Sequence, residues 1–235
     1  MTEQRFDLMS LMSVTVPPGE KGSAKVQRFE ITEDDVLRAR ISSFGSGRGS
    51  TEPGEYTKLL INGNLWMSDT HDERRDHLPA LRQAAYYGPT DGNAVSVLIT
   101  GLGLGMVINA MLQLPRVGLV DVVESNQDVI DLVGPHYQEM ADKNGVRLNI
   151  HHGDAVDRKG IFGSGDRHWD VVWHDIWLDI TADNYEDMKS LRRRYGRYSR
   201  WQDCWCSGEV KRAYDQDKRD QERYSAFAAA WSGRR

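Results

Sequence analysis

The sequence VSVLITGLGLG at residues 95–105 decides the fold class of this chain. Residues 95–100 are short, largely apolar and rich in β-branched side chains, which is typical of a buried strand. Gly101, Gly103 and Gly105 follow, and an apolar helical pattern then continues to residue 114. Glycines between a strand and a helix permit a tight turn and let a ligand approach the backbone close to a helix N-terminus. The stretch therefore predicts the first strand–turn–helix unit of an α/β domain with a ligand at the turn.

The same alternation of strands and helices continues toward the C-terminus. Strands are predicted at residues 117–123, 146–151, 170–173 and 198–206, and helices at residues 126–140, 183–195 and 209–231. Strands that alternate with helices pair in parallel, because each helix carries the chain back across the sheet. We expect an α/β fold with a Rossmann-like, doubly wound, mostly parallel sheet and a C-terminal helix.

Residues 1–90 have a different pattern and predict an N-terminal, β-rich extension. The first 50 residues read as irregular or β-rich, with an alternating strand at residues 25–31 and a loop rich in glycine and serine at 42–53. Two short strands within residues 56–67 meet at Asn62-Gly63, a strong hairpin signal. One helix, capped by Ser68 or Asp69, is expected at residues 72–86. The segment GPTDGN at 88–93 separates this extension from residues 91–235, the predicted cofactor-binding domain.

Composition narrows the class of protein. The chain has 235 residues, 39% of them hydrophobic, and a net charge of −5, which argues against a general nucleic-acid binder. Residues 189–235 nevertheless carry a net charge of +7, so nucleic-acid contact is possible only through this tail, although a solvated helix face that uses its arginines is the favoured interpretation. Neither a signal peptide nor a membrane span is predicted. Cys204 and Cys206 are poorly placed for a disulfide and indicate reduced thiols in a cytoplasmic protein.

A second motif is Glu124, which ends the predicted strand in VDVVESN. An acidic side chain at this position in such sheets accepts hydrogen bonds from both ribose hydroxyls of an adenine nucleoside. The alternative is that Glu124 caps the following helix, although Ser125 or Asn126 can serve as that cap. Glu124 therefore indicates a nucleoside ligand without distinguishing dinucleotides from other nucleosides.

Two further acidic residues follow predicted strands. The sequence IHHGDA contains Asp154 and Ala155, and WDVVWHDIW contains Asp175 just beyond the fourth strand. The carboxyl ends of parallel strands meet at one edge of a sheet, where ligands of doubly wound folds bind. We therefore expect the glycine loop, Glu124, Asp154 and Asp175 to surround one ligand.

The motifs resemble those of class I S-adenosylmethionine-dependent methyltransferases. The spacing Gly-x-Gly-x-Gly is similar to their first motif, whereas a dinucleotide fingerprint needs a glycine where Met106 stands. Together with LLINGNLWMSDTHDERRDH upstream, the series looks most like spermidine synthase and its methyltransferase-like relatives, over residues 56–181. The resemblance implies S-adenosyl-L-methionine as cofactor. No metal is expected, because no set of metal ligands accompanies His151 and His152.

The resemblance also implies roles for particular residues. The loop would wrap the methionine part of the cofactor, Asp154 would meet the adenine amino group, and Asp175 would lie beside the methyl donor. The implied cofactor-binding residues are Gly101, Leu102, Gly103, Gly105, Glu124, Ser125, Asp154, Ala155, Asp175 and His77. For catalysis we expect Asp175 and His174, of which only one should face the cofactor because neighbours in a strand point to opposite faces. Trp66, Trp173 and Trp177 are candidates to line the acceptor side or to stack on the sulfonium or the adenine.

Departures from the resemblance bear on the reaction. Aminopropyltransferases carry an aspartate at the position of Leu104, a glutamine near the position of Trp66 and a tyrosine near that of Asp76. Their fourth strand is followed by Asp-Ser-Ser-Asp-Pro. In this chain the first acid of that signature is Asp175, and the second, Asp179, lies one position later. The leading hypothesis is therefore a methyltransferase with an unknown acceptor. The alternatives are an aminopropyltransferase that uses decarboxylated S-adenosylmethionine and a non-catalytic binding module that docks a partner through its basic tail. A homo-oligomer is also expected.

Overall fold

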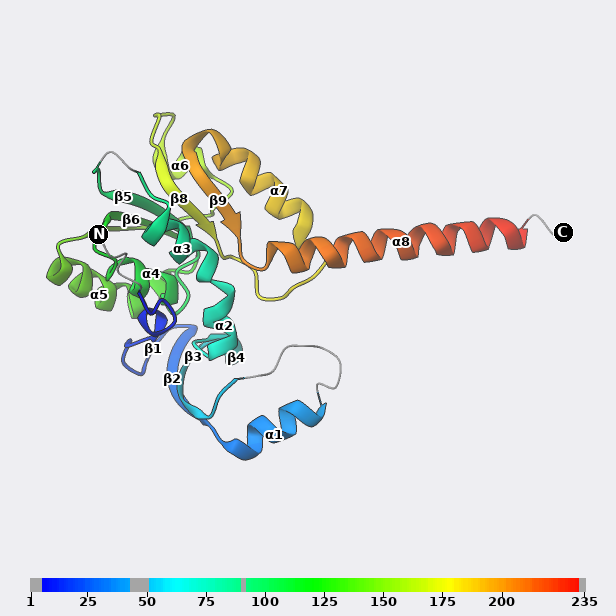
Figure 1. Cartoon of the computed structure of the whole chain (residues 1–235), viewed down its shortest axis with the longest axis horizontal. Helices are drawn as coiled ribbons and strands as arrows, with labels where there is room; N and C mark the ends of the chain where they lie inside the picture. The colour runs from blue at the N-terminus through cyan, green and yellow to red at the C-terminus, as the bar shows by residue number, and fades with distance from the viewer. Residues whose placement is uncertain (1–5, 43–50, 90–91, 233–235) are drawn as a thin grey trace.

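Two β-sheets organise the chain, as Figure 1 shows. The structure is a computed structural model that describes residues 6–42, 51–89 and 92–232. A four-stranded antiparallel sheet precedes a five-stranded parallel sheet in the sequence, and helices cover both faces of the parallel sheet. The expected α/β fold with a β-rich extension and a C-terminal helix is confirmed.

The antiparallel sheet has the order β1-β2-β3-β4. Its strands are β1 (Gly19–Lys21), β2 (Ala24–Ile31), β3 (Gly54–Ile61) and β4 (Asn64–Ser68). Strands β3 and β4 form the predicted hairpin, in which Asn62 and Gly63 both have positive φ angles, of 51° and 79°. That pair of angles suits a two-residue hairpin turn, and asparagine and glycine adopt it at the lowest steric cost.

One helix within the extension was not predicted. Residues 33–42 form α1 (Glu33–Ser42), where an irregular or β-rich segment was expected. A reciprocal cap starts it, since the Thr32 backbone N–H donates to the Asp35 carboxylate and the Asp35 N–H donates to the Thr32 hydroxyl. This T-x-x-D arrangement is a variant of the capping box and was the overlooked signal. The loop expected at 42–53 lies mostly outside the described residues.

The single helix expected at residues 72–86 is divided in two. Helix α2 (His71–Asp76) ends just before His77, and α3 (Leu78–Tyr86) starts immediately after that residue. Pro79 explains the break, because proline lacks an N–H donor and its ring clashes with the preceding turn of a continuous helix. The predicted caps were also wrong. Thr70 occupies the N-cap position of α2, while the Asp69 carboxylate accepts the Thr57 N–H and pairs with Arg74.

The parallel sheet has the order β7-β6-β5-β8-β9. Its strands are β5 (Val95–Thr100), β6 (Val117–Glu124), β7 (Arg147–His152), β8 (Trp169–His174) and β9 (Ser199–Cys204), and every neighbouring pair is parallel. The first strand of this sheet in the sequence, β5, is central. Strands β6 and β7 follow on one side of it, and β8 and β9 then lie on the other side. A doubly wound sheet of this order has its topological switch point between β5 and β8, where a ligand site is expected.

Helices divide between the two faces of this sheet. Helices α3, α4 (Met106–Met111) and α5 (Gln127–Asn144) pack on one face, around buried residues such as Val97, Val122 and Trp173. The other face packs on α7 (Asn184–Tyr195), around Leu98 and Val172. Two short elements, α6 (Arg158–Phe162) and the 3-10 helix η2 (Gly196–Tyr198), were not predicted.

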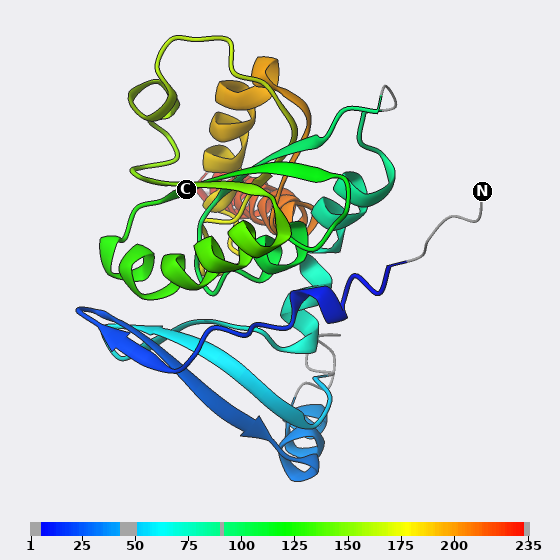
Figure 2. The same ribbon diagram turned by 90° about the vertical axis from the view of Figure 1, so that its left-hand side faces the viewer.

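The antiparallel sheet is tied to the parallel domain through α5, which lies between the two sheets in Figure 2. The turn between β1 and β2 docks on its first residues, where the N–H and hydroxyl of Ser23 both donate to the Asp128 carboxylate at 2.8 Å. A second tie joins the 3-10 helix η1 (Ser10–Met12) to α4, since the Asn109 side chain donates to the carbonyls of Leu11 and Ser13. The extension therefore packs directly against the helices of the parallel domain.

Helix α8 (Ser207–Ser232) projects away from the body of the molecule in Figure 1. Its first turns pack on α7, where Tyr214 stacks on Tyr185 with ring centroids 4.3 Å apart. Cys204 and Cys206 just before it are both buried and form no disulfide, and burial raises the pKa of the Cys204 thiol to about 12. Within the described residues, no helix combines the length and apolar character that crossing a membrane requires.

Helix α5 provides a test of local capping. The Asn126 side chain accepts the Asp128 backbone N–H at 2.9 Å and thereby caps the helix, as the sequence allowed. We expect Asn126→Ala to lower the free energy of unfolding by about 1 kcal/mol, measured by urea denaturation, because that N–H loses its acceptor. Asn126→Asp keeps the acceptor and should retain most of the stability. Equal losses in both variants would show that the cap contributes nothing.

Candidate functional site

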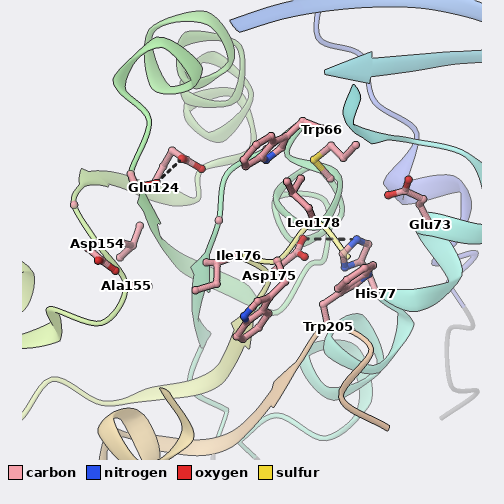
Figure 3. A pocket seen from close by; sticks show the side chains of 17 residues that line it. Trp66, Glu73, His77, Glu124, Asp154, Ala155, Asp175, Ile176, Leu178 and Trp205 are labelled. Atoms are coloured by element: carbon pink, nitrogen blue, oxygen red, sulfur yellow. Dashed lines mark hydrogen bonds and ion pairs between the residues drawn. The ribbon is translucent and has the colours of Figure 1, made fainter. Parts of the chain in front are cut away.

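A cavity of about 280 Å³ opens at the carboxyl edge of the parallel sheet, as Figure 3 shows. Residues from both sheets enclose it. The lining residues are Trp66, Met67, Glu73, His77, Gly101, Gly103, Val123, Glu124, Ser125, Gly153, Asp154, Ala155, Asp175, Ile176, Trp177, Leu178 and Trp205. The ends of β5, β6, β7 and β8 thus meet around one space, and the antiparallel extension closes it from the other side.

Glu124 stands at one end of the cavity with both carboxylate oxygens held. One oxygen accepts the Leu102 N–H from the glycine loop, and the other accepts the Asn126 N–H at the start of α5, each at 2.8 Å. These two bonds fix the carboxylate orientation. Each oxygen can accept a further hydrogen bond, so the group can still receive two ligand hydroxyls.

Asp154 and Ala155 form the wall beyond Glu124. The Asp154 carboxylate accepts the Val156 N–H at 2.9 Å, which holds the turn after β7. The Ala155 carbonyl accepts the Tyr195 hydroxyl at 2.7 Å, so this wall is anchored to α7 beneath the sheet. Ser125 completes the same end, and these predicted residues are therefore brought together with Glu124.

Neighbouring protein atoms leave no room for a side chain at two positions of the glycine loop. Gly101 has a φ of 100°, and a Cβ there would collide with the backbone oxygen of Asp175. Gly105 starts α4 with a φ of 74°, and a Cβ there would collide with the ring of Tyr137. Gly101 and Gly103 line the cavity, whereas Gly105 and Leu102 do not. Leu102 contributes through its backbone N–H to Glu124.

His77 connects the extension to Asp175. The Trp173 indole N–H donates to His77 Nδ1 at 3.2 Å, so Nδ1 carries no proton and the proton of the neutral ring resides on Nε2. His77 Nε2 lies 3.8 Å from Asp175 Oδ2. Burial lowers the pKa of His77 to about 4, which keeps the ring neutral near pH 7. His77 thus presents a fixed N–H toward the Asp175 carboxyl group.

Asp175 has the most perturbed carboxyl group of the site. Burial, together with the negative charges of Glu73, Glu124 and Asp76, raises the pKa of Asp175 to about 8. Its carboxyl group is therefore protonated at neutral pH in the ligand-free protein. A cation placed beside it would favour the ionised form and lower that pKa.

His174 does not reach the cavity, which contradicts its predicted role as a general base. Its ring is completely buried on the other face of the sheet, between the Thr100 hydroxyl at 3.0 Å and the Gln202 side chain at 3.4 Å. Burial lowers the pKa of His174 to about 4. Strand alternation is the physical reason, because successive side chains of β8 point to opposite faces.

The tryptophans divide between the cavity and the core. Trp66 and Trp177 line the cavity, as predicted, but Trp173 is buried beneath His77 and stacks on Trp201 with centroids 6.4 Å apart. Trp205 was missed. It directly follows β9, and its place at the carboxyl end of a fifth parallel strand was the available signal.

Glu73 is a second residue that sequence reasoning missed. It lines the cavity from α2 and accepts the Ser68 hydroxyl at 3.2 Å. Glu73 and His77 are four residues apart, and residues at that spacing lie on the same side of a helix. Because His77 was already a candidate, this spacing could have indicated Glu73 as well.

Comparison with known proteins gives low similarities. No family model matches the chain. A polyamine aminopropyltransferase of Prochlorococcus marinus (strain AS9601) is 29% identical over 122 residues, which are 51% of this chain and 41% of that protein. The chain thus spans less than half the length of that curated relative.

The similarity to solved structures is also low. Spermidine synthase from Thermotoga maritima superposes with a TM-score of 0.46 at 13% identity, covering 88% of this chain and 63% of that one. A putative O-methyltransferase from Klebsiella pneumoniae superposes with a TM-score of 0.31 at 18% identity, covering 52% of this chain and 61% of that one. The structural neighbours therefore include a spermidine synthase and a putative O-methyltransferase.

Proposed function

We propose that this chain binds S-adenosylmethionine in the cavity and transfers its methyl group to an acceptor. The observation that carries the proposal is the convergence of Glu124, Asp154 and Asp175, from three different parallel strands, on one cavity. Carboxylates at these strand ends suit a nucleoside at one end and a positively charged centre at the other.

The residues of the cavity fit such a ligand chemically. The fixed Glu124 carboxylate would accept the two ribose hydroxyls, with Ser125, Asp154 and Ala155 around the adenine. Asp175 would lie beside the sulfonium group. None of the described residues that line the cavity is lysine or arginine, so its charged groups all favour a cationic ligand.

Asp175 is the residue that we assign to proton transfer. When bound, the sulfonium supplies an electrophilic carbon and a leaving group, so alignment of the acceptor provides much of the rate enhancement. The Asp175 carboxylate would take the proton of the attacking nucleophile. The His77 N–H would orient that carboxylate, because Trp173 fixes the proton on Nε2. His77 is thus a positioning residue.

Aminopropyl transfer is the second candidate, and a specific observation favours it. Decarboxylated S-adenosylmethionine lacks a carboxylate, and no described lining residue offers a cationic partner for one. The curated relative, named a polyamine aminopropyltransferase, agrees with this reading. Against it, the family's loop aspartate is replaced by Leu104, whose side chain is fully buried.

Calorimetry and product analysis test both candidates. We expect S-adenosylmethionine and S-adenosylhomocysteine to bind with Kd values well below 1 mM, where binding is worth about 4 kcal/mol. Incubation of each donor with a pool of amine and hydroxyl acceptors should then release S-adenosylhomocysteine. Release of methylthioadenosine from the decarboxylated donor alone would select aminopropyl transfer. Binding without any product would favour the non-catalytic module, and no binding would refute the proposal.

A further inference from the structure

Three exposed apolar side chains gather at the opening of the cavity. Trp66, Ile176 and Leu178 are 43%, 40% and 44% exposed, yet all three line the cavity, and we call them the apolar rim. Trp66 comes from β4, whereas Ile176 and Leu178 follow β8. Single exposed apolar residues are ordinary, but a group of them at a cavity opening marks a surface that a ligand covers.

The interior beneath the rim is lined by acidic side chains. Asp175 and Glu73 line the same cavity, and the side chain of Asp175 is only 18% exposed. His77 Nε2 lies 3.8 Å from the Asp175 carboxylate. The opening is therefore apolar, whereas the interior carries carboxyl groups. This combination suits a molecule with one positively charged part and one apolar part.

Two of the three rim residues, Trp66 and Leu178, lie apart from the end assigned to the nucleoside, whereas Figure 3 shows Ile176 between Asp175 and Ala155. Figure 3 shows Trp66 and Leu178 on the same side of the cavity as Asp175 and His77, with Asp154 and Ala155 on the other side. An adenosine held between Glu124 and Asp154 would leave Trp66 and Leu178 to the second substrate. Trp66 and Leu178 are therefore expected to contact the acceptor rather than the donor.

We propose that the acceptor is an amine that carries an apolar alkyl or aryl group. Its ammonium group lies against Asp175 and Glu73, and its apolar group covers the rim. This inference rests on the proposed function and names its substrate class. A short linear diamine would leave the rim exposed to water, and a polyanion would be repelled by the carboxylates.

The transfer step balances with this acceptor. The ammonium gives one proton to the Asp175 carboxylate, and the freed nitrogen lone pair forms a bond to the methyl carbon of the sulfonium. The carbon–sulfur bond breaks and its electron pair stays on sulfur. The products are an N-methylated ammonium ion, S-adenosylhomocysteine and a protonated Asp175, which returns its proton to solvent.

Amine titrations of the full chain saturated with S-adenosylhomocysteine test the inference. Each buried methylene should tighten binding about four-fold, so hexylamine should bind up to about 60-fold tighter than propylamine. Hexanol should bind much more weakly than hexylamine, because it lacks the charge that Asp175 and Glu73 attract. Equal affinity of the two amines, or of hexanol and hexylamine, would overturn the proposal.

A matched pair of variants locates the effect at the rim. Leu178→Ser should reduce the preference for hexylamine over propylamine at least three-fold, whereas Leu37→Ser, on the distant helix α1, should leave it unchanged. Equal effects of the two variants would also overturn the proposal. Failure of the proposed function is distinguishable, because S-adenosylhomocysteine would then not bind at all, while the amines can still be titrated alone.

Discussion

Asp175→Asn should lower the turnover of methyl transfer by about 10²- to 10⁴-fold, the usual contribution of a positioned general base. The amide has nearly the shape of the carboxyl group but takes up no proton and carries no charge. Binding of S-adenosylhomocysteine, which has no sulfonium charge, should change little. Single-turnover kinetics and calorimetry on the same preparation would measure both quantities.

The same substitution should remove a pH dependence of donor binding. The pKa of Asp175 is raised to about 8 in the empty cavity, so binding of a cation below pH 8 must release its proton. The affinity for S-adenosylmethionine relative to S-adenosylhomocysteine should therefore rise as the pH rises from 6 to 8, and then level off. In Asp175→Asn the ratio should stay constant over that range.

Asp179 provides the control for these measurements. It is an exposed carboxylate in the same segment after β8 and does not line the cavity. Asp179→Asn should leave turnover within about two-fold of the unmodified chain, since surface charges contribute little at this distance. Similar losses in both variants, or full turnover in Asp175→Asn, would exclude Asp175 as the base.

Glu124→Ala should weaken binding of S-adenosylhomocysteine by about 1.5–3 kcal/mol, roughly ten- to a hundred-fold, because hydrogen bonds to a charged group are lost. It should also lower the melting temperature, since the Leu102 and Asn126 N–H groups lose their acceptor. Glu124→Asp should recover part of the affinity. Calorimetry and thermal unfolding on one sample would separate the two effects.

A ligand-side control isolates the ribose contact of Glu124. The unmodified chain should bind adenosine more tightly than 2′,3′-dideoxyadenosine, and Glu124→Ala should bind both equally, which is a double-mutant cycle across the interface. If the variant lowers only the melting temperature and keeps the preference for adenosine, then Glu124 is a structural acceptor for the loop and the cofactor assignment fails.

Local sequence signals were sufficient for the parallel domain. The apolar strand at residues 95–100, the glycines after it and the regular return of strands predicted a doubly wound sheet, because burial on both faces demands continuous apolar runs. The same topology requires strand ends to share one edge. Glu124, Asp154 and Asp175 could therefore be assigned to one ligand site from the sequence alone.

Signals inside the extension were weaker. The hairpin at Asn62-Gly63 was predicted, since its turn geometry depends on two residues alone. The cap of α1 and the break at Pro79 were equally local but were overlooked, so these errors concern interpretation of the sequence. Residues 43–50 are outside the described structure and leave the predicted loop there untested.

Contacts between distant segments could only come from the tertiary structure. The sequence offers only indirect signals for Trp205 and Glu73. Glu73 comes close to Asp175 because the extension packs on the parallel domain, and Trp205 does so because β9 pairs with β8. The pKa of Asp175 likewise arises from burial and from carboxylates on other elements. The sequence by itself determined the alternation of strands and helices and the shared edge of the sheet through hydrophobic periodicity. The strand order and the charge, shape and apolar rim of the cavity depend on long-range packing that no local pattern encodes.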